Sequence, residues 1–218
     1  MTAMDGQGAG RRLAIFDLDG TLVDSVDDLA ASVNHALARV GLPPRRRDEV
    51  RGMIGNGARV LIERAVGPHQ ELLDPALSAW REHYQAHLLD ATRPYPGVAE
   101  ALAGAGRTLA VISNKPGPMV RRILEGLGLL ARFAGVLGGG DAPPKPDPAG
   151  VRTILHRLGV AEADAILVGD SAVDAATARN AGIAFVAVTW GLTSREELVL
   201  AGAVNLVDRA EDLAPWLA

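Results

Sequence analysis

The sequence predicts an α/β protein in which a parallel β-sheet, covered by helices on both faces, is interrupted by an all-helical insertion. Three observations support this fold class. An apolar run from Leu13 to Phe16 reads as a short strand and ends abruptly at Asp17. Between about Val26 and Leu89, apolar residues recur only at helical spacing. From Thr108 onward, continuous apolar runs alternate with helical patterns, which is typical of a parallel sheet buried on both faces.

The chain is expected to divide into three parts. Residues 1–12 are rich in glycine and lack the apolar centre of a signal peptide, so we expect a flexible tail there. Residues 13–23 and 94–218 would form the sheet-containing core domain. Residues 24–93 would form a helical domain inserted directly after the first strand and its turn, here called the helical insertion.

The helical insertion is expected to hold four helices. Ser25 can cap the first, which would end at Gly41. A short helix is expected around residues 48–53, and the turn at residues 54–57 leads into a third helix. One face of a long fourth helix would carry the apolar residues Leu73, Leu77, Trp80, Tyr84 and Leu88. The two aromatic side chains are interpreted most simply as core packing.

Strands and helices alternate after the prolines of residues 93–97, and Pro96 can begin the next helix. The expected strands are residues 108–112, 133–137, 165–168, 184–189 and 204–207. The expected helices are residues 119–127, 150–158, 173–181 and 210–217. Since each apolar strand is followed by a helix, the strands are expected to run parallel.

Composition and charge exclude several classes of function. The chain has 218 residues, of which 48% are hydrophobic, and no apolar run is long enough to span a membrane. A formal net charge of −4 argues against a nucleic-acid partner, which usually needs a basic face. There is no cysteine, so disulfides, thiolate metal sites and a cysteine nucleophile are excluded. This composition fits a cytoplasmic protein, and we expect no membrane partner.

Polar side chains follow the expected strands at their carboxyl ends, where ligands gather in open parallel sheets. These residues are Asp17 and Asp19 after the first strand, Ser113, Asn114 and Lys115 after the next, and Asp170, with Asp174 one turn later. A stiff proline-rich loop at residues 143–148 also fixes Lys145. Taken singly, each residue could be a turn residue, a helix cap or a solvated charge.

Taken together, these residues predict a magnesium-dependent site for phosphoryl transfer. Carboxylates that converge on one sheet edge repel one another unless a hard cation neutralises them, and oxygen ligands suit Mg²⁺. A cation, a lysine and hydroxyl or amide donors around a carboxylate favour phosphoryl transfer by positioning and charge neutralisation. Asp17 is placed to be a nucleophile that forms an aspartyl-phosphate, and Asp19 is placed to move the proton.

The same residues resemble the haloacid dehalogenase-like phosphohydrolases in four motifs that occur in the family's order. Residues 16–25 match the first motif nearly in full, Ser113 the second, Lys145 the third and residues 169–174 the fourth. The resemblance spans the whole chain. It implies a Rossmann-like sheet as the core, and the helical insertion would be the α-helical cap of the family's first subclass.

The resemblance implies a role for each matching residue. Asp17 would be the nucleophile and a Mg²⁺ ligand, and Asp19 the general acid/base whose main-chain carbonyl binds the metal. The phosphoryl group would be bound by Ser113, Asn114 and Lys145. The other metal ligands would be Asp170 and, directly or through water, Asp174.

Two branches of the family are disfavoured by this sequence. In the dehalogenase branch the position of Asp19 is not an acid, because a leaving halide needs no proton. The phosphonatase branch uses a lysine of the cap, and residues 24–92 contain no lysine. Phosphatase chemistry is therefore expected.

Within the phosphatases, the sequence is similar to bacterial phosphoglycolate phosphatase at residues 51–58, 113–115 and 189–191, although threonine is usual where Ser113 stands. We hypothesise that Arg51 and Asn56 read the non-phosphate end of the substrate from the cap. The partner would be a small phosphorylated metabolite, with 2-phosphoglycolate favoured, and the enzyme a monomer or small homo-oligomer. Alternatives are a sugar-phosphate phosphatase, such as one for muramic acid 6-phosphate, a β-phosphoglucomutase-like isomerase, and a regulatory protein on an inactive phosphatase scaffold.

Overall fold

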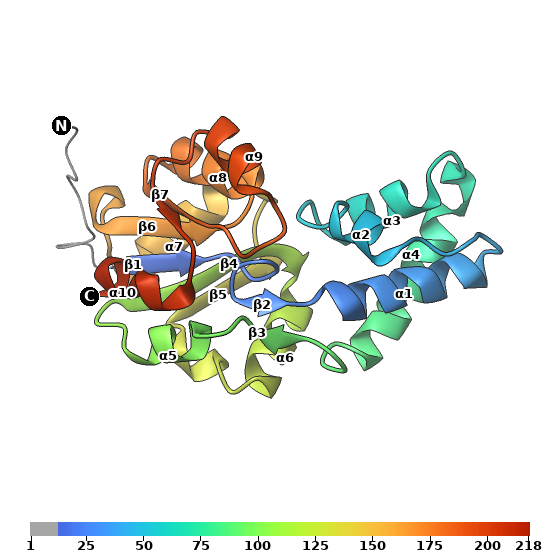
Figure 1. Ribbon diagram of the computed structural model, residues 1–218, viewed down its shortest axis with the longest axis horizontal. Helices are drawn as coiled ribbons and strands as arrows, with labels where there is room; N and C mark the ends of the chain where they lie inside the picture. The colour runs from blue at the N-terminus through green and yellow to red at the C-terminus, as the bar shows by residue number, and fades with distance from the viewer. Residues whose placement is uncertain (1–12) are drawn as a thin grey trace.

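The protein, described here from a computed structural model of residues 13–218, consists of a parallel sheet with its helices and a group of helices beside it (Figure 1). The expected tail of residues 1–12 lies outside the described residues. The main sheet holds the strands β1 (Leu13–Phe16), β4 (Thr108–Pro116), β5 (Gly135–Gly139), β6 (Ala165–Gly169), β7 (Ala184–Val188) and β8 (Leu206–Val207). All six are parallel, in the order β5-β4-β1-β6-β7-β8, so β1 lies inside the sheet.

Helices cover both faces of this sheet. They are α5 (Val98–Ala103), α6 (Gly117–Gly126), α7 (Ala149–Leu158), α8 (Ala172–Ala181), α9 (Arg195–Leu200) and α10 (Ala214–Leu217), with the 3₁₀ turns η2 (Leu130–Arg132), η3 (Glu162–Asp164) and η4 (Ala210–Leu213). Side chains alternate along β1 because successive residues of a strand point to opposite faces. Ala14 and Phe16 belong to the cluster that includes α5 and α6, whereas Leu13 and Ile15 belong to the cluster that includes α7 and α8. Burial on both faces explains the continuous apolar reading of this strand.

The helical insertion packs as a group of four helices, α1 (Val26–Arg39), α2 (Arg47–Arg51), α3 (Ala58–Val66) and α4 (Leu73–Ala86), with the 3₁₀ turn η1 (Gln70–Leu72) before α4. The chain enters through β2 (Val23–Asp24) and leaves through β3 (Arg93–Pro94), which pair antiparallel. The buried carboxylate of Asp28 accepts hydrogen bonds from the main-chain N–H groups of Ala91 and Thr92, so the two ends are tied together.

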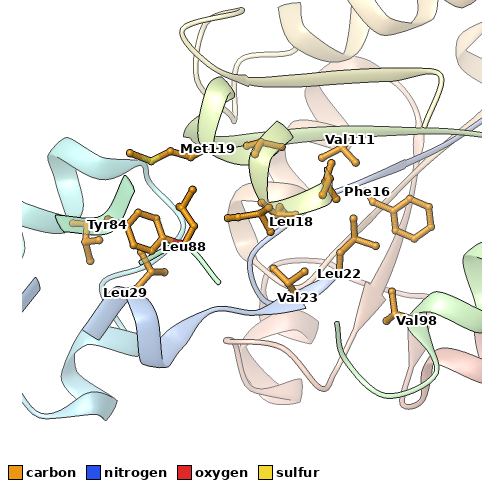
Figure 2. Packing of buried hydrophobic residues seen from close by; sticks show 14 of the residues in the cluster. Phe16, Leu18, Leu22, Val23, Leu29, Tyr84, Leu88, Val98, Val111 and Met119 are labelled. Carbon is orange, nitrogen blue, oxygen red and sulfur yellow. The ribbon is translucent and has the colours of Figure 1, made fainter. Parts of the chain in front are cut away.

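One hydrophobic cluster joins the helical insertion to the core (Figure 2). Leu18 and Met119 of the core lie beside Leu29, Tyr84 and Leu88 of the insertion in this cluster. The insertion is therefore closed against the core by apolar packing. In the part of the chain that the structure describes, no helix is both long and apolar enough to cross a membrane.

The predicted fold class is confirmed, and the differences lie at the ends and edges of elements. β4 continues past Ile112 to Pro116 with an irregular register against β5, which polar residues in this stretch concealed. β2 and β3 were not predicted, because strands of two residues have no readable period. α9 was also missed, and the expected closing helix is split into η4 and α10.

Candidate active site

Three carboxylates converge at the carboxyl ends of β1 and β6. Asp17, Asp170 and Asp174, here called the acidic trio, are buried, and each offers an oxygen within 4.8 Å of the other two. Phe16 pairs with Val168 in the parallel ladder, so Asp17 and the residues after β6 emerge at the same sheet edge. Within residues 13–218 this is the only group of three or more acids, histidines or cysteines with such convergence.

The charges of the acidic trio oppose one another. Burial raises the pKa of Asp17 to about 7, although the Lys145 ammonium partly offsets this and Asp174 adds to it. Burial also raises the pKa of Asp170 well above its usual range, and the neighbouring Asp174 and Asp17 carboxylates raise it further. Burial and the neighbouring carboxylates thus both oppose the ionised forms of Asp17 and Asp170.

Lys145 supplies part of the missing charge. Its ammonium lies 2.7 Å from Asp17 Oδ1 and 2.7 Å from Asp174 Oδ1. Burial lowers the pKa of Lys145, but the two carboxylates outweigh it, so this pKa lies above its ordinary value. Asn114 fixes the loop, because its Oδ1 accepts from Lys145 N at 2.7 Å and its Nδ2 donates to Lys145 O at 3.1 Å. Asn114 Nδ2 also donates to Gly55 O of the helical insertion at 3.1 Å.

Asp170 is held by the loops after β1 and β7. The Thr21 hydroxyl donates to Asp170 Oδ1 at 2.8 Å, and the Leu192 N–H donates to Asp170 Oδ2 at 2.7 Å. Glycine is required at two places in these loops. A Cβ on Gly20, whose φ is 90°, would lie 2.2 Å from Asp170 Oδ2, and a Cβ on Gly191 would lie 2.4 Å from Asp170 Cβ.

Asp174 is held by the start of α8. Ser171 caps this helix, since its hydroxyl accepts from Asp174 N, and Asp174 Oδ2 in turn accepts from the Ser171 N–H and hydroxyl. Asp174 Oδ1 is the oxygen that meets Lys145. The capping box thus orients the carboxylate as well as the helix.

The side chain of Asp19 has different partners from the acidic trio. Asp19 Oδ1 accepts from the Ser25 hydroxyl at 2.5 Å and from the Lys115 ammonium at 2.6 Å. Ser25 occupies the N-cap position of α1 as expected, but it makes no side-chain cap bond, because its hydroxyl is bound to Asp19. Asp19 Oδ2 makes no hydrogen bond to any described protein group and is free to meet a substrate.

Lys115 and Tyr84 are site residues whose contacts the sequence did not reveal. The buried Lys115 ammonium donates to Asp19 Oδ1 and to the hydroxyl of Tyr84, on α4, at 2.6 Å. Burial raises the pKa of Tyr84 to about 12, so its hydroxyl is neutral. Extending the predicted strand to Pro116 would have placed Ser113 and Lys115 on one side of it, since side chains alternate along a strand.

A cavity lies between the helical insertion and the core. Asp17, Asp19, Ser113 and Lys115 line its core side. The side chains that line it from the insertion are apolar and include Leu29, Ile54, Leu61 and Trp80. Its volume is about 30 Å³, enough for about two water molecules, so the closed insertion leaves little room beyond the reacting groups.

Arg51 and Asn56 do not line this cavity. Arg51 Nη2 donates to Gly191 O at 2.5 Å, which links α2 to the loop after β7. Asn56 Oδ1 accepts from Arg64 Nη2 at 2.9 Å within the helical insertion. Their role in reading the substrate stays a prediction.

Comparison with known proteins identifies the family. The model of the family described as "Haloacid dehalogenase-like hydrolase" matches residues 14–188, most of the chain. The chain belongs to the haloacid dehalogenase-like hydrolases. The resemblance proposed from the four motifs is therefore confirmed, and the family accounts for both the parallel sheet and the acids at its edge.

Similar members of the family are named for one reaction. Phosphoglycolate phosphatase 1 of Pseudomonas aeruginosa PAO1 is 39% identical over 94% of this chain and 79% of its own length. Phosphoglycolate phosphatase of Agrobacterium fabrum C58 is 42% identical over 83% of this chain and 82% of its own. The crystal structure of a predicted phosphoglycolate phosphatase from Haemophilus somnus 129PT superposes with a TM-score of 0.88 at 34% identity, covering 94% of this chain and 97% of that one. The chain is thus a phosphoglycolate phosphatase-like hydrolase of this family.

Proposed function

We propose that this haloacid dehalogenase-like hydrolase is a Mg²⁺-dependent phosphatase that hydrolyses 2-phosphoglycolate through an aspartyl-phosphate. One observation carries the proposal. Asp17 faces the cavity beside Ser113, is paired with Lys145 and forms part of the acidic trio. A carboxylate nucleophile, an ammonium and a cation site thus meet where a phosphoryl group can enter. The names of the similar proteins support the same reaction.

The acidic trio fits a magnesium ion by its chemistry. All three ligands are carboxylate oxygens, which hard cations prefer, and only one ammonium, that of Lys145, pairs with them. Asp17 and Asp170 would hold the ion, with Asp174 directly or through water and the Asp19 carbonyl as a further ligand. A bound magnesium ion would neutralise charge on the phosphoryl oxygens.

The reaction would proceed in two displacements. A carboxylate oxygen of Asp17 attacks phosphorus, the bond from phosphorus to the glycolate oxygen breaks, and protonated Asp19 gives its proton to that oxygen. Asp19, now ionised, then takes a proton from water, whose oxygen attacks phosphorus and releases phosphate from Asp17. Ser113 and Lys145 would bind the phosphoryl oxygens. The side chain of Asn114 is engaged with Lys145 and Gly55, so its contact with phosphate would come from the main chain.

The cavity favours a small substrate. In this closed arrangement the cavity holds only about two water molecules, so a sugar ring would require a larger displacement of the helical insertion than glycolate would. The expected cytoplasmic location and the monomeric or small oligomeric state are retained here as predictions. No observation favours the mutase or the inactive-scaffold alternative.

The test is phosphate release from a panel of esters, including 2-phosphoglycolate and sugar 6-phosphates, with and without Mg²⁺. Asp17→Asn should lower kcat at least about a thousandfold, because loss of a nucleophile removes the covalent route. Asp74→Asn, which changes an exposed acid on α4, is the matched control and should keep full activity. Substantial turnover by Asp17→Asn with an unchanged thermal transition would show that the nucleophile is another group.

A further inference from the structure

We propose that Lys115 binds the carboxylate of the substrate and makes the enzyme selective for phosphomonoesters that carry a carboxylate near the phosphate. This inference rests on the proposed function, because it concerns the part of the substrate that does not react. It names a specificity-determining residue on the core side of the cavity, separate from the groups that hold the phosphoryl group.

The Lys115 ammonium has more hydrogen-bond donors than protein acceptors around it. An ammonium has three N–H donors. Lys115 uses one for Asp19 Oδ1 and one for the Tyr84 hydroxyl, both at 2.6 Å, and its Nζ lies 4.9 Å from the centre of the Tyr84 ring. No third acceptor occurs among the protein groups of residues 13–218, although Lys115 is buried and lines the cavity. The remaining donor is therefore available to a molecule in the cavity.

The lining of the cavity carries little positive charge. Among its lining residues Lys115 is the only cation. Lys145 is paired with Asp17 and Asp174, and its third donor is assigned to the phosphoryl group; Arg51 donates to Gly191 O outside the lining. An anionic group that enters a cavity with apolar walls needs a nearby cation, since burying an unpaired charge is costly. Lys115 is the group that can meet it.

Lys115 lies close to the residue that would bind the phosphoryl group. Ser113 and Lys115 lie two residues apart in β4 and both line the cavity, while Asn114 between them binds Gly55 and Lys145. A phosphoryl group at Ser113 therefore has Lys115 close by. The hydroxyl of Tyr84, on the helical insertion, accepts a hydrogen bond from the Lys115 ammonium and so positions it. The Tyr84 ring stacks on that of Trp80, with ring centres 5.0 Å apart. The closeness of Ser113 and Lys115 therefore suits a substrate with few atoms between its phosphate and its carboxylate.

The experiment compares kcat/KM for 2-phosphoglycolate and for ethyl phosphate, which has the same two-carbon chain with a methyl group in place of the carboxylate. Lys115→Met should reduce the preference for 2-phosphoglycolate about 10- to 100-fold, mainly through KM, as expected for a lost charge-assisted hydrogen bond. Lys115→Arg should recover part of that preference. Arg59→Met, which changes an exposed arginine of α3 outside the cavity lining, is the matched control and should leave the ratio of the two substrates unchanged. Arg51→Met is measured beside it because Arg51 is the competing reader of the substrate.

A wild-type measurement keeps the test independent of how well Lys115→Met folds. The wild-type enzyme should prefer 2-phosphoglycolate to ethyl phosphate and should use O-phosphoethanolamine, which carries an ammonium, least. Equal use of the three esters, or loss of the preference in Arg51→Met but not in Lys115→Met, would overturn the inference and leave the phosphatase intact. Absence of any Mg²⁺-dependent phosphate release from the wild type would instead refute the proposed function.

Discussion

Gly20 shows how tightly single residues constrain the acidic trio. Its positive φ and the contact that a Cβ would make with Asp170 Oδ2 are two separate reasons for glycine. An Asp-Gly pair in a sequence is typical of an ordinary turn, yet the side chain that Gly20 accommodates is that of Asp170, which follows β6 far along the chain. Only the packing of the loop against Asp170 reveals the second reason.

Gly20→Ala should therefore cost more than backbone strain alone. We expect a loss of about 2 to 4 kcal/mol in the free energy of unfolding, because the new methyl group must displace Asp170. Gly128→Ala is the matched control, since its φ is 70° but no atom lies within 4 Å of the added Cβ. It should cost about 1 to 2 kcal/mol. Urea unfolding measures both, and equal losses would mean that Asp170 yields freely to the methyl group.

The contacts of Lys115 could not be predicted from the sequence. The strand-end pattern correctly brought Asp17, Asp170 and Asp174 together, because parallel strands share one edge. The partners of Lys115 come from two other parts of the chain, Asp19 after β1 and Tyr84 on α4. No local period links these residues. The helical spacing of Tyr84 predicted an aromatic residue of the core. The structure shows that Tyr84 is buried and that its hydroxyl accepts a hydrogen bond from Lys115.

At the scale of elements, α8 and α9 both begin with a capping box, but the two boxes have different surroundings. Ser171 caps α8 in a capping box with Asp174, and Ser194 caps α9 in a capping box with Glu197. Asp174 of the first box belongs to the acidic trio, whereas Ser194 and Glu197 of the second are both exposed. The two capping boxes thus separate the stability of a helix start from the orientation of a proposed metal ligand.

Ser171→Ala and Ser194→Ala should each lower the free energy of unfolding by about 1 kcal/mol, the usual cost of a lost cap. Only Ser171→Ala should weaken Mg²⁺ binding, by about 10-fold, because Asp174 then loses the hydroxyl that orients it. Calorimetric Mg²⁺ titration of both variants checks this. The expectation fails if the α9 variant weakens Mg²⁺ binding as much as the α8 variant.

At the scale of the whole molecule, the acidic trio links stability to pH and, under the proposed function, to magnesium. The pKa of Asp17 is raised to about 7 in the folded protein, against an ordinary value of 3.8. The folded state then binds more protons than the unfolded state, so this group makes the metal-free protein less stable as pH rises from about 4 to about 7. Magnesium binding needs the ionised carboxylate and displaces that proton.

The rise in Tm caused by Mg²⁺ should accordingly be larger at pH 8 than at pH 5.5. Thermal unfolding with 0 and a saturating concentration of Mg²⁺ at the two pH values measures it, with buffer matched for ionic strength. Asp170→Asn should remove most of the shift, and the exposed Asp74→Asn should leave it unchanged. A shift of equal size at both pH values would show that no proton is released when the ion binds.

The parts of the fold that could be predicted are those in which burial gives the sequence a regular apolar pattern. The parts that depend on contacts between residues far apart in the chain could not be predicted. Apolar runs such as residues 165–168 identified the parallel sheet because both faces are covered. The register of β4 near Pro116 and the pairing of Val23 with Pro94 follow from tertiary contacts that no local pattern carries. The same limit explains why the acids of the site were found and the contacts of Lys115 were not.

The pairing of β2 with β3 has a consequence for how such enzymes diversify. Since the chain leaves and re-enters the core through two adjacent strands, everything between them can change in length or sequence without rethreading the sheet. The catalytic machinery and the substrate cover can then evolve as separate modules. The shared cluster of Leu18 and Met119 with Leu29 and Leu88 sets one condition, because any replacement cover must offer a matching apolar face. The hydrogen bonds of Tyr84 and Gly55 to the core set another, because they reach Lys115 and Asn114 at the site.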